Sequence, residues 1–190
     1  QDSARRVWIG TDKGLYCWKD NALQCADKSH SFQRACSFKG KTCFITVDGE
    51  IRTADKEGRL SLAAKLPDVS YGLDLPGNLA VGSQWVIFTS EGSFVFDTES
   101  NMLRPSPPEW NIPGGEVSVD NRGNYWVHNK TGKLYYIRSG TGAVKVFQLM
   151  PREKVGYIDM ERYHVVHDSR DILWISTYGN GLFTYDLRTD

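Results

Sequence analysis

The glutamate side chains are the first candidates for catalysis in this sequence, because glycoside hydrolysis uses two carboxyl groups held about 5 to 10 Å apart. The glutamates are spread along the chain, and no spacing brings two of them together: Glu50, Glu57, Glu91, Glu99, Glu109, Glu116, Glu153 and Glu161. Solvated surface positions explain such a distribution. The sequence also has no Gly-x-Ser-x-Gly turn and no phosphate-binding loop. We therefore predict that this segment has no catalytic residues and is not an enzyme.

Metal binding would require histidine or cysteine ligands at short, regular spacings. His164 and His167 are three residues apart, which on a strand places them on opposite faces and argues against a shared ion. The cysteines are separated by 8, 11 and 7 residues, which matches neither a zinc site nor a Cys-x-x-Cys redox motif: Cys17, Cys25, Cys36 and Cys43. We expect no metal site and no cofactor.

The cysteines could instead pair across hairpins. A hairpin centred on Lys39 and Gly40 would place Cys36 opposite Cys43, and one centred on Asn21 would place Cys17 opposite Cys25. Disulfides across paired strands are strained, whereas a free cysteine commonly packs as a small buried hydrophobe. The sequence therefore favours free thiols, even in an oxidising compartment.

Sugar binding would use exposed aromatic rings beside polar groups. Trp110 lies in the one Pro-rich connection of the chain, PSPPEWNIPGG at 105–115, outside the repeated strands described below. Its ring could stack on a ligand, seal an interface or cap a sheet, and packing is the favoured role. Tyr178 is a second candidate for ligand contact, with the same alternatives.

All of these residues must be positioned by a hairpin that recurs along the chain. The stretch VWIGTDKGLYCW at 7–18 returns as ILWISTYGNGLFTYD at 172–186, with Trp174 in the place of Trp8. Hairpins of this kind are expected near residues 7–19, 43–55, 84–97, 124–138 and 172–186. Equivalent positions are separated by 36, 42, 40 and 48 residues, a period near forty: Trp8, Phe44, Val86, Trp126 and Trp174. A glycine closes the turn in four copies, at Gly14, Gly92, Gly132 and Gly181.

The repeat predicts an all-β chain. Further runs with strand character lie between the hairpins, so we expect four antiparallel strands per repeat. The strands do not alternate cleanly between apolar and polar residues, so both faces of each sheet must be covered. Residues 1–190 are therefore expected to form a partial β-propeller, with about four to five blades of a larger propeller of about seven. If the Trp strand is second in its blade, the chain begins without a first strand and ends without a fourth.

Composition excludes several classes of partner. The chain is 40% hydrophobic and 12% aromatic, enough for a buried core, and its formal net charge is zero. No basic stripe suggests nucleic-acid binding. No run approaches the roughly 20 apolar residues of a transmembrane helix, so we expect membrane attachment only through a helix outside this segment.

Two hairpins carry a longer signature. Asp120 and Asp168 each stand six residues before a tryptophan, in VDNRGNYWV at 119–127 and HDSRDILWIS at 167–176. With the Trp-Ile-Gly-Thr and Gly-Leu-x-x-Tyr-Asp runs, the sequence resembles the two-component regulator propeller repeat. The resemblance implies the periplasmic sensor region of a hybrid two-component protein, which detects an oligosaccharide, acts as a homodimer and signals to a cytoplasmic histidine kinase absent from this chain.

Each aspartate before a tryptophan also has a structural role open to it. Its carboxylate can accept from backbone N–H groups of the following turn, as in an Asx turn. A cation site is the alternative. For the function itself, the alternatives are a carbohydrate-active propeller enzyme, either a glycoside hydrolase or a lyase, and a propeller scaffold for protein interactions.

Overall fold

The computed structural model describes residues 1–38, 40–67, 75, 77–129, 131–148, 164–177 and 181–189. These residues form antiparallel strands and one short 3-10 helix, η1 (Pro108–Trp110), so the all-β prediction is confirmed. The chain divides into two compact units. The first comprises Gln1–Leu75, Ser83–Trp85 and Phe94–Pro105, and the second comprises Pro76–Gly82, Val86–Ser93 and Ser106–Asp190.

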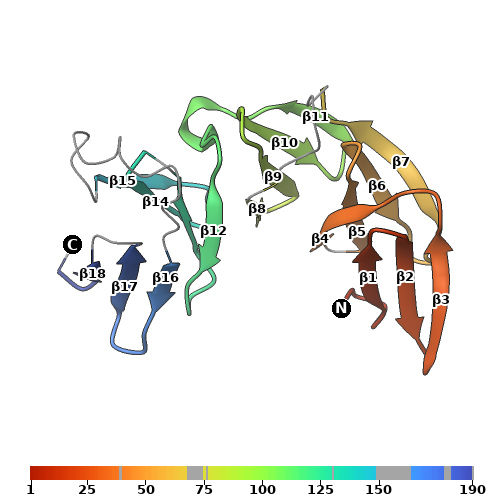
Figure 1. The fold of residues 1–190 in the computed structure, drawn as a ribbon, viewed down its shortest axis with the longest axis horizontal. Coiled ribbons are helices and arrows are strands. Elements are labelled where there is room, and N and C mark those ends of the chain that lie inside the picture. The colour runs from red at the N-terminus through yellow and green to blue at the C-terminus, as the bar shows by residue number, and fades with distance from the viewer. Residues whose placement is uncertain are drawn as a thin grey trace. The chain divides into compact units, whose positions relative to one another are not determined.

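The first unit contains two complete sheets (Figure 1). One has the order β1-β2-β3, with β1 (Val7–Thr11), β2 (Gly14–Lys19) and β3 (Ala22–Asp27). The other has the order β4-β5-β6-β7, with β4 (Phe32–Phe38), β5 (Lys41–Thr46), β6 (Glu50–Ala54) and β7 (Leu60–Lys65). Because Phe44 occupies the repeat position and lies on β5, the repeat strand is second in its four-stranded sheet.

The second unit also contains two complete sheets. One has the order β12-β13-β14-β15, with β12 (Glu116–Val119), β13 (Tyr125–His128), β14 (Lys133–Ile137) and β15 (Val144–Gln148). The other is β16-β17-β18, with β16 (His164–His167), β17 (Ile172–Thr177) and β18 (Gly181–Asp186). A further sheet has residues in both units and consists of β8 (Gly77–Val81), β9 (Gln84–Phe88), β10 (Ser93–Asp97) and β11 (Met102–Pro105). Four antiparallel strands per repeat are the composition of a β-propeller blade.

Threonine and glycine together shape the hairpin turns. The hydroxyl of Thr11 donates to the carbonyl of Gly14 at 3.0 Å, and that of Thr89 donates to the carbonyl of Gly92 at 2.9 Å. Gly14 has φ of +139°, and a Cβ there would lie 2.2 Å from the carbonyl oxygen of Asp27. The threonine and the glycine of the repeat are therefore turn residues.

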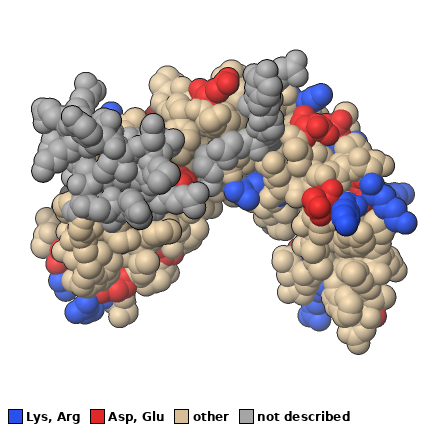
Figure 2. Space-filling view, in the orientation of Figure 1, with Lys and Arg blue, Asp and Glu red and all other residues tan. Residues whose placement is uncertain are grey.

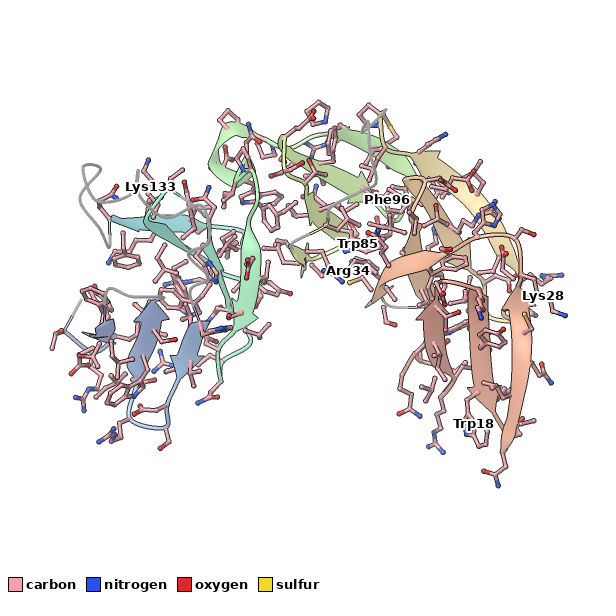
Figure 3. The ribbon with its side chains drawn as sticks, in the orientation of Figure 1. Trp18, Lys28, Arg34, Trp85, Phe96 and Lys133 are labelled. Carbon is pink, nitrogen blue, oxygen red and sulfur yellow. The ribbon has the colours of Figure 1, made fainter. Side chains whose placement is uncertain are left out.

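Aromatic residues at the repeat positions fill the core of each unit. In the first unit Trp8 meets Phe44 edge to face with ring centroids 5.1 Å apart, and Phe32 lies 6.1 Å from Phe44. Trp85 and Phe96 are fully buried, whereas Trp18 on β2 is 44% exposed (Figure 3). In the second unit one apolar cluster joins the sheets β12–β15 and β16–β18: Trp126, Leu134, Val165, Leu173 and Ile175, with Tyr136, Phe147, Tyr185 and Leu187 packed against it.

The cysteines are free thiols, and one predicted pairing is wrong. Cys36 stands opposite Cys43 across β4 and β5, as predicted. Cys17 does not stand opposite Cys25, because it pairs with Gln24. The turn of this hairpin consists of two residues with positive φ, Asp20 at 49° and Asn21 at 59°. This is the backbone of a type I′ turn, which shifts the register by one residue from a hairpin centred on Asn21 alone.

The surface carries both signs of charge. On the face shown in Figure 2, the described acidic and basic side chains are interspersed over both units. Within the parts of the chain that the structure describes, no helix has the length and apolar character to cross a membrane.

Candidate functional site

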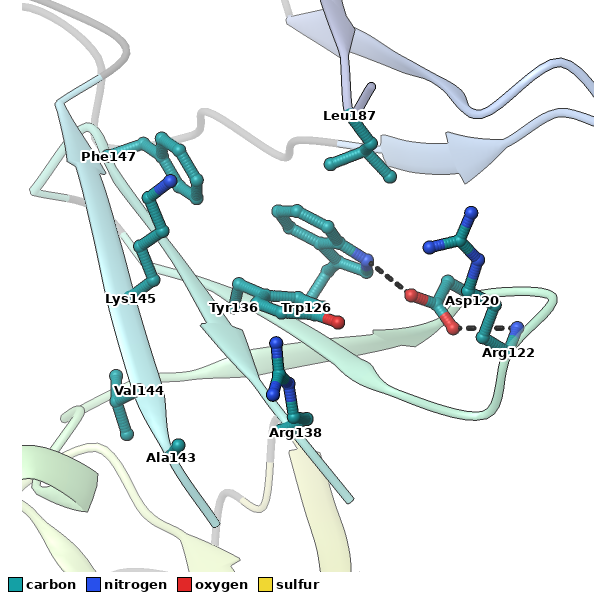
Figure 4. Close-up of a pocket in the computed structure, with 10 residues that line it drawn as sticks. All are labelled: Asp120, Arg122, Trp126, Tyr136, Arg138, Ala143, Val144, Lys145, Phe147 and Leu187. Atoms are coloured by element: carbon teal, nitrogen blue, oxygen red, sulfur yellow. Dashed lines mark hydrogen bonds between the residues drawn. The ribbon is translucent and has the colours of Figure 1, made fainter. Parts of the chain in front are cut away.

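A loop with one repeated set of hydrogen bonds precedes the Trp strand. In the loop before β13, Asp120 Oδ1 accepts from the backbone N–H groups of Arg122 at 2.9 Å and Asn124 at 2.8 Å. Its Oδ2 accepts from the indole N–H of Trp126 at 3.2 Å (Figure 4). The carboxylate therefore makes the contacts expected of an Asx turn and also fixes the tryptophan ring.

The loop before β17 repeats this geometry. Asp168 Oδ1 accepts from the N–H groups of Arg170 at 2.8 Å and Ile172 at 3.1 Å, and Oδ2 accepts from Trp174 at 3.0 Å. The indole N–H of Trp174 is the largest factor that lowers the pKa of Asp168, and the Arg170 side chain lowers it further. This carboxylate is therefore held in its charged form.

A further copy of this loop, which was not predicted from the sequence, lies at the start of the chain. Asp2 Oδ1 accepts from the N–H groups of Ala4 and Arg6, each at 2.9 Å, and Oδ2 accepts from Trp8 Nε1 at 2.8 Å. Burial raises the pKa of Asp2, but the hydrogen bonds from Trp8 and Arg6 outweigh burial and lower it. The six-residue spacing between Asp2 and Trp8 was the available signal.

Asp55 forms the same turn without a tryptophan. Its Oδ1 accepts from the N–H groups of Glu57 at 3.0 Å and Arg59 at 2.8 Å. The backbone also closes as in the other copies, because the N–H of Asp55 donates to the carbonyl of Arg59 at 3.1 Å. The same turn therefore also forms between β6 and β7, where no tryptophan follows the aspartate.

In each unit one such loop is bonded to the next. Arg6 donates from Nε to Asp2 Oδ2 at 2.7 Å and from its terminal nitrogens to the carbonyls of Asp55 at 2.9 Å and Lys56 at 3.2 Å. Its guanidinium also lies 5.1 Å from the ring centre of Trp8. Arg6 therefore ties the Asp2 loop to the Asp55 loop within the first unit.

His167 connects the corresponding loops of the second unit. The backbone N–H of Asn121 donates to His167 Nδ1 at 3.2 Å, which leaves Nε2 as the donor to Asp171 Oδ1 at 3.0 Å. Arg122 also forms an ion pair with Asp171. His167 is buried and His164 on the same strand is exposed. Among the described residues, no three His, Cys, Asp or Glu side chains are grouped as metal ligands.

A pocket with a volume of about 470 Å³ lies within the second unit, beside the Asp120 loop (Figure 4). Its lining combines three aromatic rings, three cations, one carboxylate and aliphatic groups: Trp126, Tyr136, Phe147, Arg122, Arg138, Lys145, Asp120, Ala143, Val144 and Leu187. The ring centre of Trp126 lies 4.6 Å from that of Tyr136 and 6.0 Å from that of Phe147. The pocket therefore has an aromatic wall, most of which comes from β13, β14 and β15.

The charged groups of the pocket differ in what they already contact. Asp120 accepts hydrogen bonds from the backbone of its own loop, and Arg122 forms an ion pair with Asp171. The ammonium of Lys145 lies 5.1 Å from the ring centre of Phe147. Arg138 is exposed, and its guanidinium makes no hydrogen bond or ion pair with any residue that the structure describes. With one carboxylate in its lining, the pocket offers binding groups and not the acid pair that glycoside hydrolysis needs.

Trp110, which was a candidate for ligand contact, is not part of the lining of this pocket. Trp110 is 8% exposed, its indole N–H donates to the carbonyl of Gly142 at 2.9 Å, and its ring lies against Gly142 so closely that a Cβ there would be 2.4 Å away. This placement fits the packing role that the sequence favours over ligand stacking. Tyr178 lies outside the described residues. Tyr136, Phe147, Arg138 and Lys145 were not predicted as ligand residues. Tyr136 and Arg138 lie in the predicted hairpin at 124–138, and Phe147 and Lys145 lie on β15, which follows it.

Solved structures with a similar fold are β-propellers. The extracellular domain of BT4673 from B. thetaiotaomicron, described as a hybrid two-component system, matches with a TM-score of 0.61 and 13% identity over 96% of this chain and 26% of that chain. Virginiamycin B lyase from Staphylococcus aureus matches with a TM-score of 0.60 and 14% identity over 97% of this chain and 67% of that one. BamB from Moraxella catarrhalis matches with a TM-score of 0.63 and 13% identity over 96% and 58%.

These similarities show the fold and leave the family open. The β-propeller class predicted from the repeats is confirmed. No protein-family model matches the chain, and no curated protein matches it. The chain spans about a quarter of the BT4673 domain, 26% of its length.

Proposed function

We propose that this chain is a ligand-sensing propeller segment of a hybrid two-component protein. In this proposal it lies in the periplasm, detects an oligosaccharide, belongs to a homodimer and signals to a cytoplasmic histidine kinase elsewhere in the protein. Two observations support it: the Asp-x-x-x-x-x-Trp hairpin repeat, and the similarity in fold to the BT4673 extracellular domain.

The pocket beside Trp126 carries the proposal. Ligand pockets are concave, mostly apolar and supplied with a few polar groups that fix orientation, and their volumes run from about 300 to 1,000 Å³. This pocket has a volume of about 470 Å³ and presents the half-buried rings of Tyr136 and Phe147 beside cationic donors. Aromatic faces can pack against the C–H groups of a sugar ring while the donors bind its hydroxyls. The arrangement suits recognition without turnover.

The position of the pocket suggests how binding could be transmitted. A ligand shifts a conformational equilibrium only by its differential affinity for the two states. The pocket draws residues from the sheet β12–β15 and also Leu187, which follows β18 in the neighbouring sheet of the same unit. A ligand that contacts both sheets would favour one packing of Leu187 against Trp126 and Phe147 over another.

The test is a thermal melt of the full chain against neutral and acidic oligosaccharides from plant and host glycans. We expect one saccharide class to raise the melting temperature by several degrees and to be recovered intact, because a ligand that binds only the folded state stabilises it. No shift with any saccharide would contradict the proposal and favour a protein-interaction scaffold. A chemically altered saccharide would contradict it in favour of a propeller enzyme, as the virginiamycin B lyase match allows.

A further inference from the structure

We propose that the pocket beside Trp126 selects saccharides that carry a carboxylate, that is, uronate-containing oligosaccharides. This inference rests on the proposed function, since it names the class of sugar that the site would take. It begins from the three cations that line the pocket, Arg122, Arg138 and Lys145, against the single carboxylate of Asp120.

Two of these cations already have partners, because Arg122 is paired with Asp171 and Lys145 contacts the ring of Phe147, so Arg138 is the cation left for a ligand. Asp120 Oδ1 and Oδ2 accept three hydrogen bonds from the loop and from Trp126, so the carboxylate is directed into its own turn. Asp171 pairs with Arg122. The guanidinium of Arg138 makes no hydrogen bond or ion pair with the described parts of the chain, although it lies beside the aromatic wall (Figure 4). A ligand anion would therefore meet an unpartnered guanidinium.

The chemistry of Arg138 favours a carboxylate. A guanidinium is planar and presents parallel N–H donors that match the two oxygens of a carboxylate, and such charge-assisted pairs are about twice as strong as neutral hydrogen bonds. Lys145 adds a second positive charge above the ring of Phe147. A pyranose packed on Tyr136 and Phe147 would place a carboxylate substituent among these donors. The aromatic wall supplies affinity for the ring, and the cations supply the preference for the acid.

The experiment compares a galacturonate trisaccharide with its fully methyl-esterified form, by titration calorimetry on the full chain. We expect the acid to bind at least about tenfold more tightly than the ester, because the ester lacks the charge-assisted contact with Arg138. The variant Arg138→Gln should lose about tenfold in affinity for the acid and clearly less than that for the ester, which keeps only the hydroxyl contacts. Arg104→Gln is the matched control, because Arg104 is an exposed arginine of β11 outside the pocket.

Each other outcome overturns the inference in a distinguishable way. Equal affinity for the acid and the ester would reject carboxylate selection and leave oligosaccharide sensing intact. If the chain bound neither these two nor any other saccharide tested, the proposed function would be rejected as well. The same loss in Arg104→Gln would mean that overall charge, and not this pocket, attracts the acid. Tighter binding of adenosine monophosphate than of the uronate would assign the aromatic wall and its cations to a nucleotide.

Discussion

Each aspartate that precedes a repeat tryptophan accepts from two backbone N–H groups and one indole N–H. In Asp2, Asp120 and Asp168 these contacts occupy both carboxylate oxygens. A carboxylate engaged in this way is a poor proton donor or acceptor for a substrate, because hydrogen bonds to the charged form stabilise it. These three aspartates therefore build the loops that precede the tryptophan strands.

Replacement of Asp120 by alanine should measure the structural value of one such carboxylate. We expect Asp120→Ala to lower the free energy of unfolding by about 1 to 3 kcal/mol, because the buried N–H of Asn124 and the indole of Trp126 lose their acceptor. Urea denaturation gives the value. The control is Asp12→Ala at an exposed turn position, which should change stability by less than about 0.5 kcal/mol. Equal losses in both variants would contradict the assignment.

The protonation of His128 should make the stability of the chain depend on pH. Burial lowers the pKa of His128 to about 4, and the charge of His164 adds to the lowering. In the unfolded chain the imidazole has a pKa near 6.5. Between pH 6.5 and pH 4 the unfolded state therefore binds more protons than the folded state, and the free energy of unfolding decreases as the pH falls. Stability should drop by about 2 kcal/mol from pH 7 to pH 5.

Thermal or urea unfolding at several pH values tests this prediction. The variant His128→Gln should lose most of the slope between pH 7 and pH 5. The aspartates with a lowered pKa do not add to this slope, because the stabilisation that they supply is complete above their unfolded value of 3.8 and is lost only as the pH falls below it: Asp2, Asp27, Asp55, Asp97, Asp168 and Asp186. A wild-type curve that is flat above pH 5 would refute the role of His128.

At the scale of the element, the loop before the Trp strand needs one residue in the left-handed region. The fourth residue has positive φ in the loops of Asp2, Asp120 and Asp168, and also in the Asp55 turn before β7: Arg5 at 60°, Gly123 at 78°, Asp171 at 61° and Gly58 at 91°. Glycine adopts this conformation at no steric cost, while other residues are strained by roughly 1 kcal/mol or more. The Gly of the repeat pattern is therefore a backbone requirement that some copies meet with a strained residue.

The substitution Gly123→Ala isolates this requirement, because a Cβ at Gly123 would meet no atom within 4 Å. We expect a loss of about 1 kcal/mol of stability from backbone strain alone. Gly140→Ala is the control, since Gly140 also has open space around it but no positive φ. That variant should be neutral or slightly stabilising, and a loss equal to that of Gly123→Ala would point to a cause other than the backbone angle.

The repeat elements were largely predictable, and their departures have local causes. Trp8, Trp126 and Trp174 mark the strands by type and spacing, because a β-hairpin between packed sheets needs a large apolar residue there. Asp2 was missed although it stands six residues before Trp8, the same spacing as Asp120 to Trp126 and Asp168 to Trp174. The register of the β2–β3 hairpin was misjudged because Asp20 and Asn21 both adopt positive φ, which composition does not reveal.

At the scale of the whole molecule, side chains join one repeat to the next inside each unit. Arg6 is the clearest case, because its side chain is 7% exposed and contacts Asp2, Asp55 and Lys56. Such a contact depends on how neighbouring sheets pack. The pocket residues Tyr136, Arg138 and Phe147 were not predicted because they depend on the same kind of packing. The sequence indicates the order of strands within a repeat, but it does not indicate which side chains line a shared cavity.

The variant Arg6→Ala tests this junction. We expect a loss of about 3 to 5 kcal/mol, because Asp2 would keep a buried charge without its partner. Arg6→Lys should recover only part of the loss, since an ammonium cannot supply donors to the Asp55 and Lys56 carbonyls together. Chemical denaturation gives both values, with Arg104→Ala as the exposed control. Full recovery by lysine would show that charge, and not the planar fork, is what the junction requires.

The facing thiols of β4 and β5 have a kinetic consequence. Burial raises the pKa of Cys36 to about 11 and that of Cys43 to about 12. Only the thiolate attacks an oxidant or an alkylating reagent, so both side chains react slowly at neutral pH while the strands are paired. The folded hairpin thereby protects its own cysteines from oxidation, and the rate at which Cys43 is alkylated becomes a clock for how often these two strands open.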